Sequence, residues 1–316
     1  MKINPETGLP SPLTRRRVLK ISAALGAIGC MATSPAISAA MAVGEKIRWR
    51  GIALGAEAEI QIAHGSKHVA EQALNAAITE LRRLESLFNL YDPASLVSKL
   101  NRKGEVNRPP ADFLTLLSLA QSVSTATSGG FDITVQPLWQ NKANTAPIGH
   151  ENLYMGADKI SLTQPGMAVT LNGIAQGYIT DRITEVLNAA GLKHVLINAG
   201  EIRSTGEAAI QQPWRIATSI GSEQEELRNQ ALAISSAYTT VQDGMRPHLF
   251  NGRTGEAITE FDTVLVKAPN AALADALSTG LSVLPEEMWP QVMQNMDGVQ
   301  LTIKAVRRDG SRLFYG

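Results

Sequence analysis

An aspartate and a threonine stand four residues apart in an otherwise apolar stretch near the C-terminus. Asp275 and Thr279 lie between Ala271 and Leu284, where most other residues are Ala, Leu, Val or Gly. Residues four apart share one face of a helix. A carboxylate and a hydroxyl together there could bind a hard cation such as Mg²⁺ through oxygen. Alternatively, Thr279 bonds back to its own helix and Asp275 only favours the first turn.

A glycine-rich loop is a second candidate for ligand binding. The sequence L-N-G-I-A-Q-G-Y, from Leu171 to Tyr178, joins an apolar segment to a predicted helix. Glycine allows the backbone to approach a ligand closely, and a helix N-terminus offers free N–H groups to an anion. The loop matches neither G-x-G-x-x-G nor the P-loop pattern. It is compatible with phosphate binding, and equally with an ordinary tight turn.

The third candidate is a histidine in the segment R-P-H-L-F-N-G-R-T-G. His248 could act as a general base near neutral pH, or it could be an ordinary loop residue close to a turn. A further glycine turn, Gly129-Gly130, leads into the apolar segment that begins at Phe131. The chain contains no G-x-S-x-G motif, so the sequence gives no sign of a hydrolase nucleophile elbow.

Composition excludes several classes of protein. The 316 residues include 29 Lys and Arg against 29 Asp and Glu, so the formal net charge is zero, which argues against a nucleic-acid partner. Hydrophobic residues make up 44% and charged residues 18%, which argues against extensive disorder. Cys30 is the only cysteine, so the chain has no internal disulfide and no cysteine-based metal site.

The N-terminus has the pattern of an export signal. Three arginines within residues 14–20 precede an apolar run over 21–32, and small residues of A-x-A type follow up to residue 42. We expect residues 1–42 to be a twin-arginine signal peptide that sends the folded protein to the periplasm. A less favoured alternative is a lipid anchor at Cys30.

Apolar spacing predicts the elements that must position these candidates. We expect helices over 69–87, 96–100, 112–127, 177–190 and 271–284. We expect strands within 47–63, near 159–162 and 167–171, and over 195–198, 213–220, 231–235, 262–267, 299–306 and 312–315. Because the two types mix without a strict βαβ alternation, the sequence predicts an α+β fold in one domain, residues 43–316.

Taken together, these segments resemble the ApbE family, the FAD:protein FMN transferases. Seven blocks occur in the family's order: Leu54-Gly55-Ala56 for M-G-T, Phe88 to Asn101 for F-S-x-Y-x-P…S-x-L-N, Gly130 to Leu138 for G-x-F-D-x-T-V-x-P-L, 170–178 for D-L-G-G-I-A-K-G-Y, Asn198 to Arg203 for N-x-G-G-x-I-R, His248 to Gly255 for H-I-x-D-P-R-T-G, and Ala274 to Thr279 for A-D-A-L-A-T. Any one block is weak, but seven in order are specific.

The resemblance implies that the protein binds FAD and Mg²⁺ and moves FMN onto a threonine of a partner protein, releasing AMP. It implies a metal site at Asp275, Thr279 and a main-chain carbonyl of Gly173, with Ala175 as the neighbouring alternative. It also implies His248 as the base for the acceptor hydroxyl, and a membrane-bound redox protein as the acceptor. The implied FAD contacts are Leu54, Tyr91, Gly130, Phe131, Asp132, Thr170, Gln176 and Leu249.

The chain departs from the family pattern at several positions. Thr170 replaces an aspartate, Asn172 a glycine and Gln176 a lysine, and Asn251-Gly252 replaces Asp-Pro. These changes bear on FAD affinity and on the choice of acceptor. The glycine-loop sequence together with the export signal looks like the NosX branch, which serves nitrous-oxide respiration. Two other functions stay open: an FAD pyrophosphatase that forms FMN and AMP, and a non-catalytic FAD-binding assembly factor.

Overall fold

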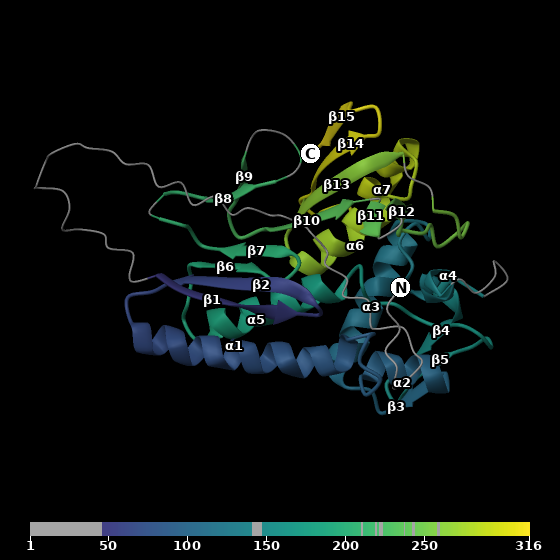
Figure 1. Cartoon of the computed structure of the whole chain (residues 1–316), viewed down its shortest axis with the longest axis horizontal. Coiled ribbons are helices and arrows are strands. Elements are labelled where there is room, and N and C mark those ends of the chain that lie inside the picture. Colours follow the sequence, from purple (N-terminus) through teal and green to yellow (C-terminus); the bar gives the residue numbers. More distant parts are fainter. Residues whose placement is uncertain are drawn as a thin grey trace, which may run out of the picture.

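The computed structural model of the chain describes residues 46–316 except 141–146, 210, 219, 221–223, 237, 242–243 and 258–259. An eight-stranded sheet runs through it, and every neighbouring pair of its strands is antiparallel (Figure 1). In spatial order the strands are β1 (Lys46–Ala53), β2 (Ala56–Ala63), β6 (Val195–Asn198), β7 (Ile202–Thr205), β10 (Ala231–Ser236), β13 (Phe261–Ala268), β14 (Thr302–Arg307) and β15 (Arg312–Tyr315).

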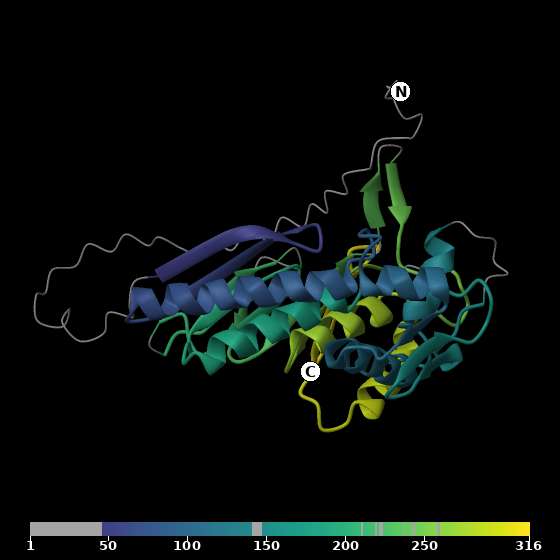
Figure 2. The same cartoon turned by 90° about the horizontal axis from the view of Figure 1, so that it is seen from below.

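Helices cover one face of this sheet. The helices are α1 (Lys67–Phe88), α2 (Leu96–Lys103), α3 (Ala111–Ala126), α4 (Gln136–Trp139), α5 (Ala175–Ala189), α6 (Ala271–Leu281) and α7 (Trp289–Asn295). α1 packs against α5, α5 packs against α6, and α6 lies on β10 and β13, so the three form one layer. Figure 2 shows the long α1 running alongside α5 on this side of the sheet.

Smaller sheets surround the large one. A three-stranded sheet has the order β3 (Glu105–Asn107), β5 (Lys159–Leu162), β4 (Leu153–Met155). Two hairpins are β8 (Trp214–Ala217) with β9 (Gln224–Leu227), and β11 (Tyr238–Val241) with β12 (Gly244–Pro247). The green β11–β12 hairpin projects from the body of the molecule in Figure 2, and its second strand leads directly to His248.

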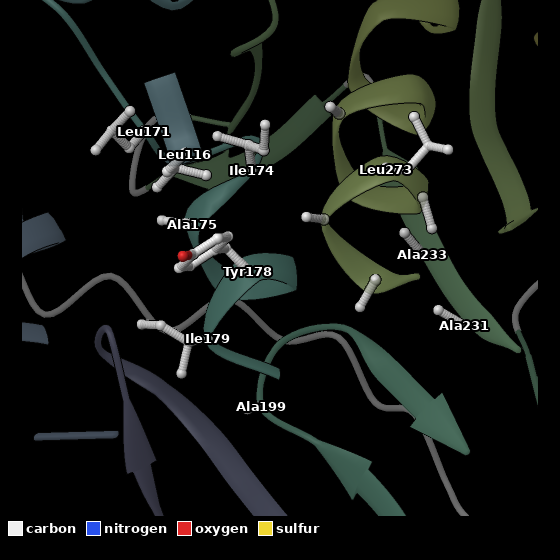
Figure 3. Packing of buried hydrophobic residues seen from close by; sticks show 14 of the residues in the cluster. Leu116, Leu171, Ile174, Ala175, Tyr178, Ile179, Ala199, Ala231, Ala233 and Leu273 are labelled. Atoms are coloured by element: carbon white, nitrogen blue, oxygen red, sulfur yellow. The ribbon is translucent and has the colours of Figure 1, made fainter. Parts of the chain in front are cut away.

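The central strands bury side chains on both faces, because successive residues of a strand point to opposite sides. In β10, Ala231 and Ala233 face the helix layer, whereas Leu232 and Ile234 join a second cluster with Trp214 of β8. Figure 3 shows the first face, where small residues of β10 lie beside α6 and α5. The main core runs from β1 to β14, so the helices and the sheet share one interior.

The predicted α+β fold is confirmed, but the strand expected at 167–171 is wrong. This segment has no regular secondary structure and belongs to no strand. The side-chain amide of Asn101 takes the place of a partner strand: Asn101 Oδ1 accepts the Val169 N–H at 2.7 Å, and Asn101 Nδ2 donates to the Val169 carbonyl at 2.8 Å. The backbone N–H and carbonyl of Val169 are therefore satisfied without a partner strand.

The predicted signal peptide, residues 1–42, lies outside the described residues, as do Cys30 and the boundary at residue 43. Both the export signal and the domain limits therefore stay predictions. Within residues 46–316, leaving out the gaps given above, no helix has the length and apolar character needed to cross a bilayer.

Close packing of α5 on α6 gives a prediction about stability. A Cβ atom added to Gly177 would lie 2.3 Å from the main-chain oxygen of Ala271. Because two backbones meet there, neither side can yield easily, and Gly177→Ala should lower the free energy of unfolding by about 1–3 kcal/mol. Denaturant unfolding would measure this. Gly65→Ala is the matched control, since a Cβ on Gly65 meets nothing within 4 Å, and equal stability of the two variants would contradict the packing argument.

Candidate active site

The residues predicted to bind a metal come together where the glycine loop meets α6. Asp275 is buried, and its Oδ2 accepts the N–H of Gly177 at 3.2 Å. One turn further along α6, Thr279 lies against the loop, so that a Cβ on Gly173 would sit 2.9 Å from Thr279 Oγ1. The structure therefore brings Gly173, Asp275 and Thr279 to one place, from segments far apart in the sequence.

The start of α6 is fixed by side chains on both sides of it. Asn270 Oδ1 accepts the Leu273 N–H at 2.9 Å. Asp181, from α5, accepts the N–H groups of Ala271 and Ala272 at 2.8 and 2.9 Å. Burial raises the pKa of Asp181 to about 6, while these two donors and the nearby Arg203 act in the opposite direction. Asp181 thus ties α5 to α6 and helps to hold the register of Asp275 against the glycine loop.

Two serines near Thr279 have no signal in the sequence. Ser235 Oγ of β10 lies 2.8 Å from Ser278 Oγ and 3.4 Å from Thr279 Oγ1. Ser278 is buried and also donates to the main-chain oxygen of Asp275 at 3.0 Å. Ser235 thus contacts the Thr279 side chain from the sheet, and Ser278 joins Ser235 to α6. A serine in a strand has no characteristic spacing, so sequence reasoning could not have found Ser235.

The donor set fits a hard cation. A carboxylate, a hydroxyl and a close main-chain approach supply the oxygen ligands that Mg²⁺ prefers. Thr279 and Gly173 are partly exposed, which leaves room for further oxygens from water or a substrate. In the described part of the chain, no group of three or more His, Cys, Asp or Glu could hold a metal.

The segment from Gly129 to Asp132 packs closely against the end of α6 and against the loop that follows His248. A Cβ on Gly280 of α6 would meet Phe131 Cβ at 2.9 Å, and a Cβ on Gly252 would meet Asp132 Cβ at 2.2 Å. Gly280 and Gly252 therefore permit contacts that a larger residue would prevent. As a result, the predicted flavin-binding segment and the histidine block lie side by side.

The Asp132 side chain has a role within the protein. It is buried, and its Oδ1 accepts both the N–H and the hydroxyl of Thr134 at 2.7 Å. Its Oδ2 accepts the N–H of His150 at 2.8 Å. The His150 ring nitrogen Nδ1 also lies 3.4 Å from Asp132 Oδ2, and this side-chain contact raises the pKa of the His150 imidazole above its ordinary value. The Asp132 carboxylate thus stabilises the local conformation of this segment. A contact of Asp132 with FAD would therefore involve its main-chain atoms. His150 was not singled out from the sequence.

Thr170 and Tyr91, two more predicted FAD contacts, lie on adjacent loops. The Thr170 N–H donates to Ile133 O at 2.7 Å, and Thr170 Oγ1 accepts the Asn172 N–H at 3.3 Å. Asn172 Nδ2 in turn donates to Tyr91 Oη at 3.4 Å. The Tyr91 side chain is 58% exposed, so its ring is available to a ligand at the surface. The structure therefore links both residues to the start of the glycine loop.

Gln176 and Leu54 occupy different surroundings. Gln176 is buried, and a Cβ on Gly200 would lie 2.4 Å from Gln176 Nε2, so this side chain points into the turn between β6 and β7. Leu54 lies in the β1–β2 turn with a φ of +47°. Its N–H donates to Glu85 Oε1 of α1 at 2.7 Å. The described hydrogen bonds tie Leu54 to α1, and none of them joins it to the metal-site residues.

His248 lies at the base of the β11–β12 hairpin, beside aromatic rings. The Trp139 ring of α4 meets the His248 ring edge-on, with centroids 6.0 Å apart, and meets Phe250 at the same distance. The next residue, Leu249, is buried. The histidine thus belongs to a loop held between α4 and the end of α6, where Asn251 Nδ2 donates to Val283 O at 3.0 Å. An imidazole held in this way could take a proton from a substrate.

The chain is similar in sequence to known proteins. The sequence matches the ApbE family over residues 54–303. The FAD:protein FMN transferase of Haemophilus influenzae is 29% identical over 252 residues, which cover 68% of this chain and 73% of that protein. The Klebsiella pneumoniae protein of the same name is 24% identical over 267 residues, covering 73% and 76%.

Solved structures show the same fold. A variant of the flavin transferase ApbE from Vibrio cholerae has 25% identity and a TM-score of 0.72, covering 86% of this chain and 97% of its own. The flavinyl transferase ApbE from Pseudomonas stutzeri, at 21% identity, has a TM-score of 0.73 with 86% and 94% covered. Because the family match spans most of the sequence and the fold agrees, the chain belongs to the ApbE family.

Proposed function

We propose that the chain is a transferase that moves FMN from FAD to a threonine hydroxyl of a partner protein, in a reaction that depends on Mg²⁺. Its curated relatives are named FAD:protein FMN transferase, which supports flavin transfer from FAD to a protein. The Mg²⁺ dependence rests on one observation. Gly173, Asp275 and Thr279 lie together beside the loops predicted to bind the flavin.

The reaction follows the pattern of phosphoryl transfer, in which positioning and charge neutralisation do most of the work. The acceptor hydroxyl oxygen would bond to the phosphorus of the FMN moiety. The bond from that phosphorus to the bridging oxygen would break, and AMP would leave with the electron pair. His248 would accept the hydroxyl proton. Asp275, Thr279 and the Gly173 carbonyl would hold Mg²⁺, which supplies positive charge next to the phosphoryl oxygens.

The surroundings of the loops support binding of FAD at this place. Tyr91 presents an exposed ring, while Thr170 and the main chain of Gly130 to Asp132 lie on neighbouring segments. Trp139 and Phe250 add aromatic surface near His248. An isoalloxazine ring stacks well on aromatic side chains. Gln176 stands in place of a lysine and Thr170 in place of an aspartate, so the glycine loop has lost one charge of each sign relative to the family pattern, and we expect both changes to affect FAD affinity.

One assay separates the three functions that the sequence left open. The protein would be incubated with FAD, Mg²⁺ and an acceptor domain, with a Thr→Val form of the acceptor as control. Covalent flavin on the threonine form alone supports the proposal. Free FMN and AMP without labelled acceptor would make the protein a pyrophosphatase, and bound but unchanged FAD would make it a carrier. Mass spectrometry and in-gel flavin fluorescence distinguish these outcomes.

We also propose that the protein works in the periplasm, on a membrane-bound redox protein, after export by the twin-arginine route. Changing Arg15 and Arg16 together to lysine should leave it in the cytoplasm, because lysine keeps the charge but not the planar guanidinium. Cell fractionation would measure this. The matched control changes Arg48 and Arg50, beyond the signal, to lysine, and normal periplasmic accumulation of the signal variant would contradict the route. Membership of the NosX branch stays a prediction.

A further inference from the structure

The short helix α2 has no part in the function proposed so far, although the sequence block S-x-L-N lies on it. α2 lies beyond the end of α1, beside the small β3–β5–β4 sheet (Figure 1). It begins at Ser95, whose Oγ accepts the Ser98 N–H at 3.2 Å, and it ends at Gly104 in the left-handed conformation. Both ends are thus fixed by local contacts, which makes α2 a firm support for its side chains.

Two side chains of α2, three residues apart, each hold the main chain of a different loop. Ser98 is buried, and its Oγ donates to the Leu90 carbonyl at 3.1 Å, next to Tyr91. Asn101 makes the two hydrogen bonds to Val169, next to Thr170. Residues three apart lie on one side of a helix. The same side of α2 therefore holds both loops that carry predicted FAD contacts.

The two loops also meet each other away from the helix. Asn172 Nδ2 donates to Tyr91 Oη at 3.4 Å. The loop held by Asn101 then continues to Gly173, which lies against Thr279. A chain of contacts thus runs from α2 through Thr170 and Asn172 to the metal-site residues. Displacements of about 1 Å in such a site can cost about a hundredfold in rate.

We propose that Ser98 and Asn101 are positioning residues that act together as a bracket. They set the spacing between the Tyr91 loop and the Thr170–Gly173 loop. Ser98 places the Tyr91 ring for the flavin, and Asn101 places Thr170 and the Gly173 carbonyl for the phosphates and the metal. Neither side chain touches the substrate in this role. The inference rests on the proposed function, because it takes Tyr91, Thr170 and Gly173 as parts of the flavin and metal site.

Ser98→Ala and Asn101→Ala should differ in their effects on the binding of FAD and Mg²⁺. Removing one buried hydrogen bond shifts the equilibrium between the held conformation of the loop and its other conformations by about fivefold. Ser98→Ala should therefore raise the dissociation constant for FAD about fivefold, with an unchanged half-saturating Mg²⁺ concentration. Asn101→Ala should raise both quantities. In a Tyr91→Ala background, Ser98→Ala should have no further effect on FAD affinity. If Ser98→Ala acted through a general loss of stability, it would weaken FAD binding further in that background. Asn101→Asp keeps one of the two hydrogen bonds to Val169, and it replaces Asn101→Ala in these measurements if the alanine variant does not fold.

Titration of FAD and Mg²⁺ with the full-length mature protein tests the bracket. The controls are Ser122→Ala, an exposed serine that bonds to a helix carbonyl, and Asn188→Ala, an exposed asparagine. If both bracket variants lower the melting temperature but keep wild-type affinities for FAD and Mg²⁺, the bracket is refuted.

Hydrogen exchange separates this failure from a failure of the proposed function. If the wild type neither binds nor transfers flavin, the proposed function fails, and the bracket is judged on exchange of the unliganded protein. Faster exchange confined to 89–93 in Ser98→Ala and to 167–173 in Asn101→Ala supports it. Unchanged exchange in those two segments overturns it.

Discussion

Replacing Asp275 with alanine is expected to abolish Mg²⁺-dependent transfer of FMN. Asp275 is the carboxylate of the proposed metal site, and it is buried beside the glycine loop. A metal ion supplies several kcal/mol of stabilisation to charge that develops in a transition state, and each 1.36 kcal/mol is a factor of ten in rate. We therefore expect the rate to fall by about 10³-fold or more, with a much higher Mg²⁺ requirement for the remaining activity.

The fold should tolerate this change better than the reaction does. Alanine removes the hydrogen bond that Asp275 accepts from the Gly177 N–H, which contributes about 1 kcal/mol, and it also removes a buried charge. The melting temperature should thus change little. Asp275→Asn keeps the shape of the side chain and should lose metal dependence in the same way. Asp262→Ala, at an exposed position of β13, is the control. Undiminished transfer by Asp275→Ala at low Mg²⁺ would refute the metal assignment.

The long helices could be predicted from the sequence because their signals are local. The helix predicted over 69–87 corresponds to α1 (Lys67–Phe88), and the helix predicted over 112–127 corresponds to α3 (Ala111–Ala126). In both, apolar residues recur at helical spacing and a turn or a proline marks an end. The glycine that follows α5, Gly191, has a φ of +84°, as a C-terminal cap should.

Short strands could not be predicted so well, because their partners lie far along the chain. β7 pairs with β6 on one side and with β10 on the other, and its four residues alone carry little pattern. The segment at 167–171 has apolar residues typical of a strand, yet its partner is a side chain 68 positions earlier, Asn101. No pattern within a short window contains that information.

The site shows the same division. The spacing of Asp275 and Thr279 pointed to a shared helix face, and the structure has both on α6. The approach of Gly177 to Asp275 joins residues 98 positions apart, and only the resemblance to a family suggested that these segments meet. The resemblance could not show that the Asp132 carboxylate is used by Thr134 and His150. Nor did it include Ser235, whose position depends on the pairing of β10 within the sheet.

Replacing His248 with asparagine is expected to slow transfer while leaving the binding of FAD and Mg²⁺ intact. A threonine hydroxyl is a poor nucleophile at neutral pH, and a general base contributes about 10²–10⁴-fold. The single-turnover rate at saturating FAD should fall by that amount. In the wild type the rate should also fall toward acid pH, because a protonated imidazole cannot accept the proton. The asparagine variant should lack this acid limb.

The competing role for His248 is to order its loop around the flavin through the Trp139 ring, which it meets at 6.0 Å. That role predicts weaker FAD binding by His248→Asn, with a nearly normal rate once FAD is saturating. The dissociation constant and the single-turnover rate, measured on the same variant, therefore decide between the two roles. His68→Asn, at an exposed position of α1, is the matched control. An unchanged rate at saturation, with the acid limb retained, means that another group takes the threonine proton.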